Sequence, residues 1–375
     1  MRRIIFLLVV SIILISCTPK TENKIPSQNK QEEKEYIEID PNLEILNSMT
    51  LDEKIGQLFI FGYDGLSPSA EILSFIENHH IGGIIFFQRN VDNTTQLKES
   101  INILKKANPS ALPLFFSIDE EGGSVARIPN TTFKSHRQLG IMDNTNETHR
   151  TGSEIGSTLR EVGINMDFAP VLDMVNTKKN TLLYNRTFGS SASTVSKHGE
   201  AFYRGLRDEG IIPVGKHFPG HGNTIVDSHK NLPYIYYTKE ELLEKDILPF
   251  TNLISEGLNV IMVGHISLPK IDPSNLPASQ SNIIVNDLLR NELNFNGIAI
   301  TDDTEMKGYA SNDEAYKKAI VRSFNGGMDI FLVCHTLNKQ NLALKSIKEA
   351  IETGIISEER LNQSVYRIIT EKIRL

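Results

Sequence analysis

The run IPVGKHF (Ile212–Phe218) passes from apolar residues directly into Lys216 and His217. Seven more short runs rich in Ile, Val and Phe recur along the chain. They are LFIFG from Leu58, GGIIFF from Gly82, PLFFSID from Pro113, NMDFAPVLD from Asn165, NVIMVGHI from Asn259, GIAITDD from Gly297 and MDIFLV from Met328. Each run is continuously apolar rather than alternating, which predicts strands buried on both faces.

Amphipathic stretches separate these runs, and they carry the signals of helix ends. Capping-box spacing occurs at Thr50 with Glu53 and at Thr238 with Glu241, and helix-stopping glycines stand at Gly210, Gly257 and Gly327. A strand followed by a helix, repeated eight times over about 280 residues, matches the size of one (β/α)8 barrel. We therefore predict an α/β fold, a TIM-type barrel that forms a single catalytic domain.

Polar residues end the predicted strands with regularity. They are Asp119 and Glu120, Asp173, Lys216 and His217, His265, and Asp302 and Asp303. In a (β/α)8 barrel the C-terminal ends of all strands open at one mouth, whatever their separation in sequence. The pattern therefore predicts one shared site.

The first seventeen residues, MRRIIFLLVVSIILISC, read as an export signal rather than as part of the fold. The apolar run Ile4–Ile15 is shorter than the ~20 residues that span a bilayer as a helix. Leu14–Cys17 resembles a lipobox, in which Cys17 is lipidated. We expect residues 1–17 to be a lipoprotein signal peptide and the protein to be exported and lipid-anchored to a bacterial membrane. An ordinary signal peptide or a short membrane anchor is the alternative.

Residues 18–40 are polar and almost free of large apolar side chains, so we expect a flexible tether before a domain at 41–375. Cys334 is the only cysteine besides Cys17, so no disulfide is expected within the domain. The net charge of −7, without a Lys/Arg-rich block, argues against nucleic acid as a partner. We expect a monomer.

The segment KHFPGHGNTIVDSH (Lys216–His229) concentrates titratable groups in a Gly-rich stretch. Three histidines in one loop indicate proton transfer or metal ligation. The residue types at His217, His221, Asp227 and His229 suit zinc or manganese, but no histidine pair with i, i+4 spacing lies within a predicted helix, and the glycines favour a loop. A metal-dependent hydrolase therefore stays an alternative, and no metal is the expectation.

A mechanism without metal needs a carboxylate nucleophile and a separate proton donor. Asp302, which ends an apolar strand, suits the first role. His229 suits the second, because Asp227 lies two residues before it and is able to hold the imidazole and raise its basicity. The alternative for Asp227 is a turn-forming residue.

Five motifs in order carry a family resemblance: IDEEGG at Asp119, APVLD at Ala169, NRTFG at Asn185, KHFPGHG followed by VDSH, and TDDTEM at Thr301. From about Met49 to Ile369 the chain resembles the family 3 glycoside hydrolases. Within them it is similar to the β-N-acetylglucosaminidases, whose branch has the Asp-x-His element seen at Asp227.

The resemblance implies a retaining enzyme that removes terminal, nonreducing β-linked N-acetylglucosamine through a glycosyl ester on Asp302. His229 would be the acid/base and Asp227 its orienting partner. The sugar hydroxyls would be bound by Asp119, Arg127, Arg186, Lys216 and His217; for Arg127 a place on a surface helix is the alternative. No cofactor is implied. Family and export together point to peptidoglycan fragments or muropeptides as the carbohydrate substrate.

Two positions depart from the family's usual pattern. Thr304 stands where a hydrophobic residue is usual, which predicts altered contacts around the acetamido group, and Glu120 stands where glutamine is common, which predicts an added charge near the sugar. Two other functions stay open: a phosphorylase that passes the sugar to phosphate, and a sugar-binding protein without turnover. His221 and His265 are left without a role.

Overall fold

The computed structural model describes residues 40–224, 226–228 and 230–375. Residues Asp40–Leu375 form one compact unit. The predictions for the signal peptide, for Cys17, for nearly all of the tether and for His229 lie outside the described residues. Within the described ranges, no helix combines the length and the apolar character needed to cross a membrane.

The described residues form nine strands, all of them short. They are β1 (Phe59–Phe61), β2 (Gly83–Phe86), β3 (Phe115–Ile118), β4 (Met166–Asp167), β5 (Ile212–Pro213), β6 (Gly215–Phe218), β7 (Val260–Val263), β8 (Ile298–Asp303) and β9 (Ile330–Val333). All pair in parallel, in the order β5-β4-β3-β2-β1-β9-β8-β7-β6.

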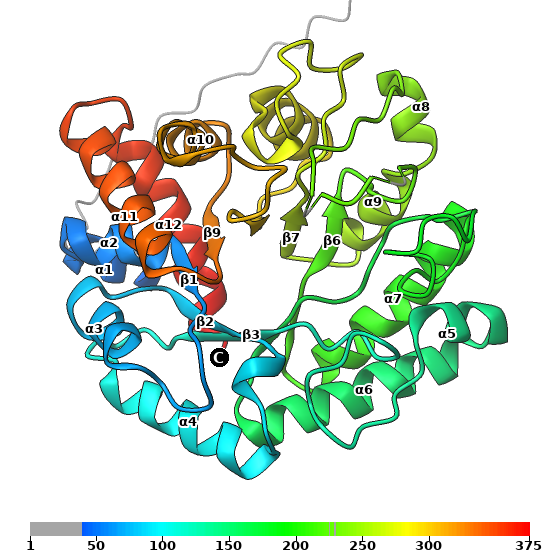
Figure 1. Ribbon diagram of the computed structural model, residues 1–375, viewed down its shortest axis with the longest axis horizontal. Helices are drawn as coiled ribbons and strands as arrows, with labels where there is room; N and C mark the ends of the chain where they lie inside the picture. The colour runs from blue at the N-terminus through cyan, green and yellow to red at the C-terminus, as the bar shows by residue number, and fades with distance from the viewer. Residues whose placement is uncertain (1–39, 225, 229) are drawn as a thin grey trace, which may run out of the picture. The chain divides into compact units, whose positions relative to one another are not determined.

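The helices follow the strands along the chain and lie outside them (Figure 1). They are α1 (Pro41–Ser48), α2 (Leu51–Gln57), α3 (Ala70–His79), α4 (Thr94–Ala107), α5 (His136–Met142), α6 (Thr145–Val162), α7 (Ala192–Asp208), α8 (Lys239–Glu244), α9 (Leu248–Ser255), α10 (Asp313–Asn325), α11 (Leu337–Glu352) and α12 (Glu358–Lys372). A π-helical segment, Ile283–Glu292, takes the place of a regular helix between β7 and β8.

The barrel closes through the run IPVGKHF, because the two strands at the ends of the sheet are consecutive in the chain. Only Val214 separates β5 from β6, and its N–H lies 3.0 Å from the Asp167 carbonyl and 2.9 Å from that of Ala169. β5 pairs with β4, and β6 pairs with β7. The predicted fifth strand is thus two short strands, and the predicted (β/α)8 barrel is confirmed.

The strands are buried on both faces, as their continuously apolar sequences predict. Every residue of β1, β2, β3, β7 and β9 is buried. Their large side chains, such as Phe59, Phe86 and Phe115, form one core with the apolar faces of the surrounding helices. This closed core holds the strand ends in fixed positions relative to one another.

The helix boundaries follow the predicted signals. Both capping boxes form, at Thr50 with Glu53 before α2 and at Thr238 with Glu241 before α8. Gly210 stands between α7 and β5 with a φ of 78°, a backbone conformation that residues with a Cβ rarely adopt. After such a helix end, the chain leads into the next strand.

Candidate active site

The predicted site residues that the structure describes come together at the C-terminal ends of the strands. Asp119 directly follows β3, Lys216 and His217 lie in β6, and Asp302 lies near the end of β8. Arg127 and Arg186 come from the segments that follow β3 and β4. Their placement at one mouth agrees with the prediction; their catalytic and sugar-binding roles stay predictions.

A buried lysine forms the centre of the charge network. Lys216 Nζ lies 2.7 Å from Asp119 Oδ1 and 2.7 Å from Glu121 Oε1. Arg186 donates two parallel hydrogen bonds to Glu121, from Nε at 2.8 Å and from Nη2 at 2.7 Å. Arg127 Nη2 lies further out, 4.0 Å from Asp119 Oδ2. The side chains of Lys216 and Glu121 are each only 1% exposed, whereas that of Asp119 is 20% exposed. Asp119 and Arg127, which is 22% exposed, are therefore the most exposed members of this network.

The network keeps its members charged although they are buried. Burial alone would raise the pKa of Glu121, but the charges of Arg186 and Lys216 outweigh it and hold that pKa well below its ordinary value. Burial would likewise lower the pKa of Lys216, but Asp119 and Glu121 raise it above its ordinary value. The site therefore offers fixed charges and donors at neutral pH.

A second carboxylate, Asp173, holds the two histidines of the KHFPGH segment. Its Oδ2 lies 2.7 Å from His217 Nδ1, and its Oδ1 accepts a hydrogen bond of 2.6 Å from the backbone N–H of His221. Burial would raise the pKa of Asp173, but His217 and His221 lower it overall. Asp173 thus fixes the ring of His217 through its Nδ1 atom.

The segment that carries Asp227 is held by neighbouring elements. Asn180 donates from Nδ2 to the carbonyls of Gly222 and Thr224, at 3.2 and 2.8 Å. The imidazole of His221, which is buried, lies with Nε2 3.1 Å from Ser228 Oγ. These contacts hold Gly222, Thr224 and Ser228, which lie close in sequence to Asp227, the predicted partner of the acid/base.

Asp227 itself makes a turn and is partly exposed. Its carbonyl accepts hydrogen bonds from the N–H groups of Lys230 and Asn231, at 2.9 and 3.1 Å. The backbone of Asp227 therefore forms the turn that was the alternative for this residue. A turn in the backbone does not conflict with a catalytic role for the side chain.

The two residues that depart from the family pattern are both buried. Glu120 is fully buried, and its carboxylate accepts hydrogen bonds from the N–H groups of Arg127 and Ile128, at 2.6 and 3.0 Å. Thr304 is also buried, with Oγ1 2.8 Å from the Leu332 carbonyl. Both side chains therefore hold neighbouring backbone, and the altered sugar contacts stay predictions.

Sequence reasoning missed Glu121 and took its neighbour Glu120 as the polar strand end. The signal was present, since residues two apart in an extended segment point to the same side, and Glu121 is two residues after Asp119. The structure also places His265, which is buried with Nδ1 2.8 Å from Ser279 Oγ and Nε2 3.0 Å from the Asp303 carbonyl. His265 thus supports the turn that follows the nucleophile candidate.

Asp246 is a buried acid next to this segment, and it gives a prediction about pH and stability. Both of its carboxylate oxygens contact Asn223 Nδ2, at 2.8 and 2.9 Å. Burial, reinforced by the charge of Asp173, raises the pKa of Asp246 to about 7. A raised native pKa means that ionisation lowers the free energy of unfolding as the pH rises from about 4 to about 7, by up to about 4 kcal/mol.

We therefore expect Asp246→Asn to gain stability relative to the wild type between pH 4 and pH 8, measured by urea unfolding. Asp92→Asn, an exposed acid bonded to Asn93, is the control and should show no such gain. Equal pH dependence of the wild type and the Asp246→Asn variant would contradict the assignment.

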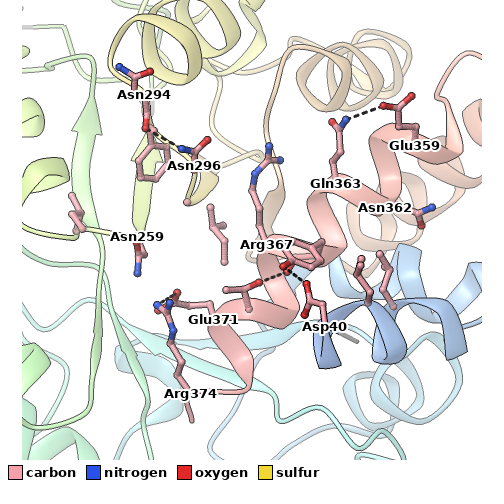
Figure 2. A pocket seen from close by; sticks show the side chains of 18 of the residues that line it. Asp40, Asn259, Asn294, Asn296, Glu359, Asn362, Gln363, Arg367, Glu371 and Arg374 are labelled. Atoms are coloured by element: carbon pink, nitrogen blue, oxygen red, sulfur yellow. Dashed lines mark hydrogen bonds and ion pairs between the residues drawn. The ribbon is translucent and has the colours of Figure 1, made fainter. Parts of the chain in front are cut away.

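No cluster of three or more His, Cys, Asp or Glu side chains arranged to hold a metal ion is found among residues 40–224, 226–228 and 230–375. A cavity of about 960 Å³ lies elsewhere, beside α12 and α1 (Figure 2). It is lined by residues that precede strands, such as Asn259 before β7 and Asn296 before β8. It therefore lies at the opposite end of the barrel from the catalytic mouth.

Enzymes with a (β/α)8 barrel have their active sites at the C-terminal ends of the strands, and this chain places buried acids and cations there. The chain matches the glycosyl hydrolase family 3 N-terminal domain over residues 50–371, and it belongs to this family of glycosidases.

Named relatives are similar over most of the chain. Beta-hexosaminidase A of Pseudoalteromonas piscicida is 33% identical over 331 residues, which cover 81% of this chain and 55% of that protein. Beta-hexosaminidase LpqI of Mycobacterium tuberculosis is 32% identical over 330 residues, covering 85% of this chain and 82% of LpqI. A solved family 3 beta-N-acetylglucosaminidase from a Paenibacillus species matches with a TM-score of 0.85 and 36% identity, covering 87% of this chain and 63% of its own. The chain thus spans little more than half of the first relative and less than two thirds of the Paenibacillus protein.

Proposed function

We propose that the protein is a retaining exo-β-N-acetylglucosaminidase that hydrolyses terminal, nonreducing β-linked N-acetylglucosamine. The observation that carries the proposal is the geometry of one mouth, where Asp302 at the end of β8 shares the strand ends with the Lys216 network. The beta-hexosaminidases of P. piscicida and M. tuberculosis and the Paenibacillus beta-N-acetylglucosaminidase support the choice of sugar.

In the proposed reaction, a carboxylate oxygen of Asp302 attacks the anomeric carbon and forms a glycosyl ester while the glycosidic bond breaks. His229, oriented by Asp227, gives its proton to the departing oxygen. The neutral imidazole then takes a proton from water, which attacks the same carbon and releases Asp302. Two inversions at one carbon give net retention of configuration. The backbone N–H of Asp303, 2.8 Å from Asp302 Oδ1, supports a fixed orientation of the nucleophile.

The charge network suits a neutral, hydroxyl-rich ligand. Asp119, which is partly exposed above Lys216, is an acceptor for sugar hydroxyls, and Arg127 and His217 are donors at the same mouth. Fixed polar groups of this kind set the orientation of a small ligand. Arg186 makes its two bonds to Glu121, so we assign it to holding the network together as well as to the sugar.

The cellular location of the protein is part of the same proposal. We infer export by residues 1–17 and anchoring through a lipid on Cys17, from the sequence pattern alone. A protein at that location meets cell-wall fragments, so we propose muropeptides or other peptidoglycan-derived glycans as the substrate.

The test is release of chromophore from an aryl N-acetyl-β-glucosaminide, with the matching β-glucoside as a control for the acetamido group. The assay is run with and without a chelator and with and without inorganic phosphate. Hydrolysis that neither addition changes supports the proposal. Loss of activity with chelator would favour a metal-dependent hydrolase, a phosphate-dependent rise with a sugar phosphate product would favour a phosphorylase, and binding without turnover would favour a sugar-binding protein.

The acid/base assignment predicts a dependence on the leaving group. His229→Ala should lower kcat/KM by about 10²- to 10⁴-fold for disaccharides, whose leaving group needs a proton, and far less for aryl sugars with acidic phenols. His149→Ala, a substitution of an exposed histidine on α6, serves as the control. An equal loss of kcat/KM on both substrate classes would contradict the assignment of His229 as the general acid.

A further inference from the structure

The turn that follows Asp302 is fastened to the end of the neighbouring strand β9. Glu305 accepts hydrogen bonds from the N–H groups of His335 and Thr336, at 2.7 and 2.9 Å, and from Thr336 Oγ1 at 2.7 Å. Asp303 Oδ2 lies 3.1 Å from His335 Nε2. Both carboxylates of this turn therefore contact His335, and Glu305 also contacts Thr336.

Asp303 connects this attachment to the proposed nucleophile. Its backbone N–H donates to Asp302 Oδ1 at 2.8 Å, and its own Oδ1 accepts from the N–H of Glu305 at 3.1 Å. The Asp303 side chain thus holds the turn whose first N–H group is bonded to Asp302 Oδ1. Positioning errors of about 1 Å at a reacting atom cost about 10²-fold in rate.

The imidazole of His335 is supported from a third element. Its ring lies 5.3 Å from the ring of Phe87, at an interplanar angle of 34°. The guanidinium of Arg89 covers the same phenyl ring at 4.5 Å, and Arg89 also donates to the Cys334 carbonyl at 2.6 Å. Phe87 and Arg89 follow β2, so the position of His335 is set by the ends of three strands.

The charges around His335 favour its cationic form. The Asp303 carboxylate raises the pKa of His335 above its ordinary value, against the effects of burial and of Arg89, and Glu305 adds to the increase. The imidazolium of His335 thus lies beside Asp303, the residue next to Asp302, and adds a positive charge to this end of β8.

We propose that His335 is a positioning residue for the nucleophile: through Asp303 it fixes the direction of the Asp302 carboxylate. The inference rests on the proposed function, because it assigns Asp302 the attack on the anomeric carbon. His335 acts through Asp303.

The experiment compares full-length wild type with His335→Gln, which keeps a neutral donor, and His335→Lys, which keeps a cation. We expect His335→Gln to lower kcat/KM on the aryl substrate by about 10- to 100-fold near pH 6 and to slow ester formation with a fluorinated glycosyl inhibitor to the same degree. Because the cation is lost, the acidic limb of the pH profile should move up by roughly half a unit. His335→Lys should restore the position of that limb.

The matched control is His149→Gln. His149 is 42% exposed and pairs with Asp208 at 3.0 Å, and His335 is 45% exposed and pairs with Asp303 at 3.1 Å. The two histidines therefore match in exposure and in having an acidic partner, but the partner of His335 is the residue next to Asp302. If His335→Gln equals His149→Gln in rate, labelling and pH profile, or changes only the melting temperature, the inference is overturned and the proposed function stands. If the wild type neither turns over the glycoside nor is labelled at Asp302, both the inference about His335 and the proposed function are contradicted.

Discussion

Replacing Asp302 with alanine abolishes turnover, with an expected loss in kcat of about 10⁴-fold or more. In the proposed mechanism this carboxylate supplies the bond to the anomeric carbon, so its removal removes the covalent step. The side chain lies at the end of β8, and the backbone N–H of Asp303 fixes one of its oxygens at 2.8 Å. A fluorinated glycosyl inhibitor should label this residue in the wild type, as read by peptide mass.

The control is Asp52→Asn, an exposed acid of α2 that pairs with Lys348 at 2.7 Å. It should leave turnover and labelling unchanged. Asp302→Asn distinguishes loss of charge from loss of the side chain, and it should be as inactive as Asp302→Ala. A label on another residue, or turnover in both Asp302 variants, would exclude the proposed nucleophile.

The barrel is predictable from the sequence because its strands are buried on both faces. Continuous apolar runs such as LFIFG leave no solvent-facing residues, and each run gives one strand or strand pair. The strand lengths are less predictable. The run NMDFAPVLD yields only Met166–Asp167 as β4, since Pro170 has no N–H to donate, and pairing resumes at Val171 as an isolated bridge to Lys216.

The candidate site is predictable in location and less so in its contacts. Parallel strands bring their polar ends to one mouth, so Asp119 and Lys216 are adjacent although 97 positions separate them. Which of two neighbouring acids joins the Lys216 network depends on the local turn, and it is Glu121 rather than Glu120. His335 follows an apolar run that reads only as core, so nothing in its local sequence identifies its contact with Asp303.

Lys216→Met should cost both stability and activity, because it removes one charge from the centre of a buried network. Methionine keeps the length and apolar stem of the side chain, so packing changes little. Glu121 keeps Arg186, but Asp119 loses its contact of 2.7 Å, and the pair of acids loses the cation between them. Leaving a buried charge without one partner costs about 3–5 kcal/mol. We expect about 3 kcal/mol in the free energy of unfolding, since Asp119 is partly exposed.

The control for Lys216→Met is Lys317→Met on α10. Lys317 pairs with Glu314 at 2.7 Å, but both side chains are exposed, so we expect a change within about 0.5 kcal/mol. Urea unfolding measures the stability of both variants, and kcat/KM on the aryl substrate measures activity. Lys216→Met should lose about 10³-fold in kcat/KM at temperatures where it remains folded, because Asp119, which we propose binds the sugar, is no longer held in place. If only stability falls, Lys216 supports the fold and Asp119 does not depend on it for binding. If neither falls, the charge network is not what organises this mouth.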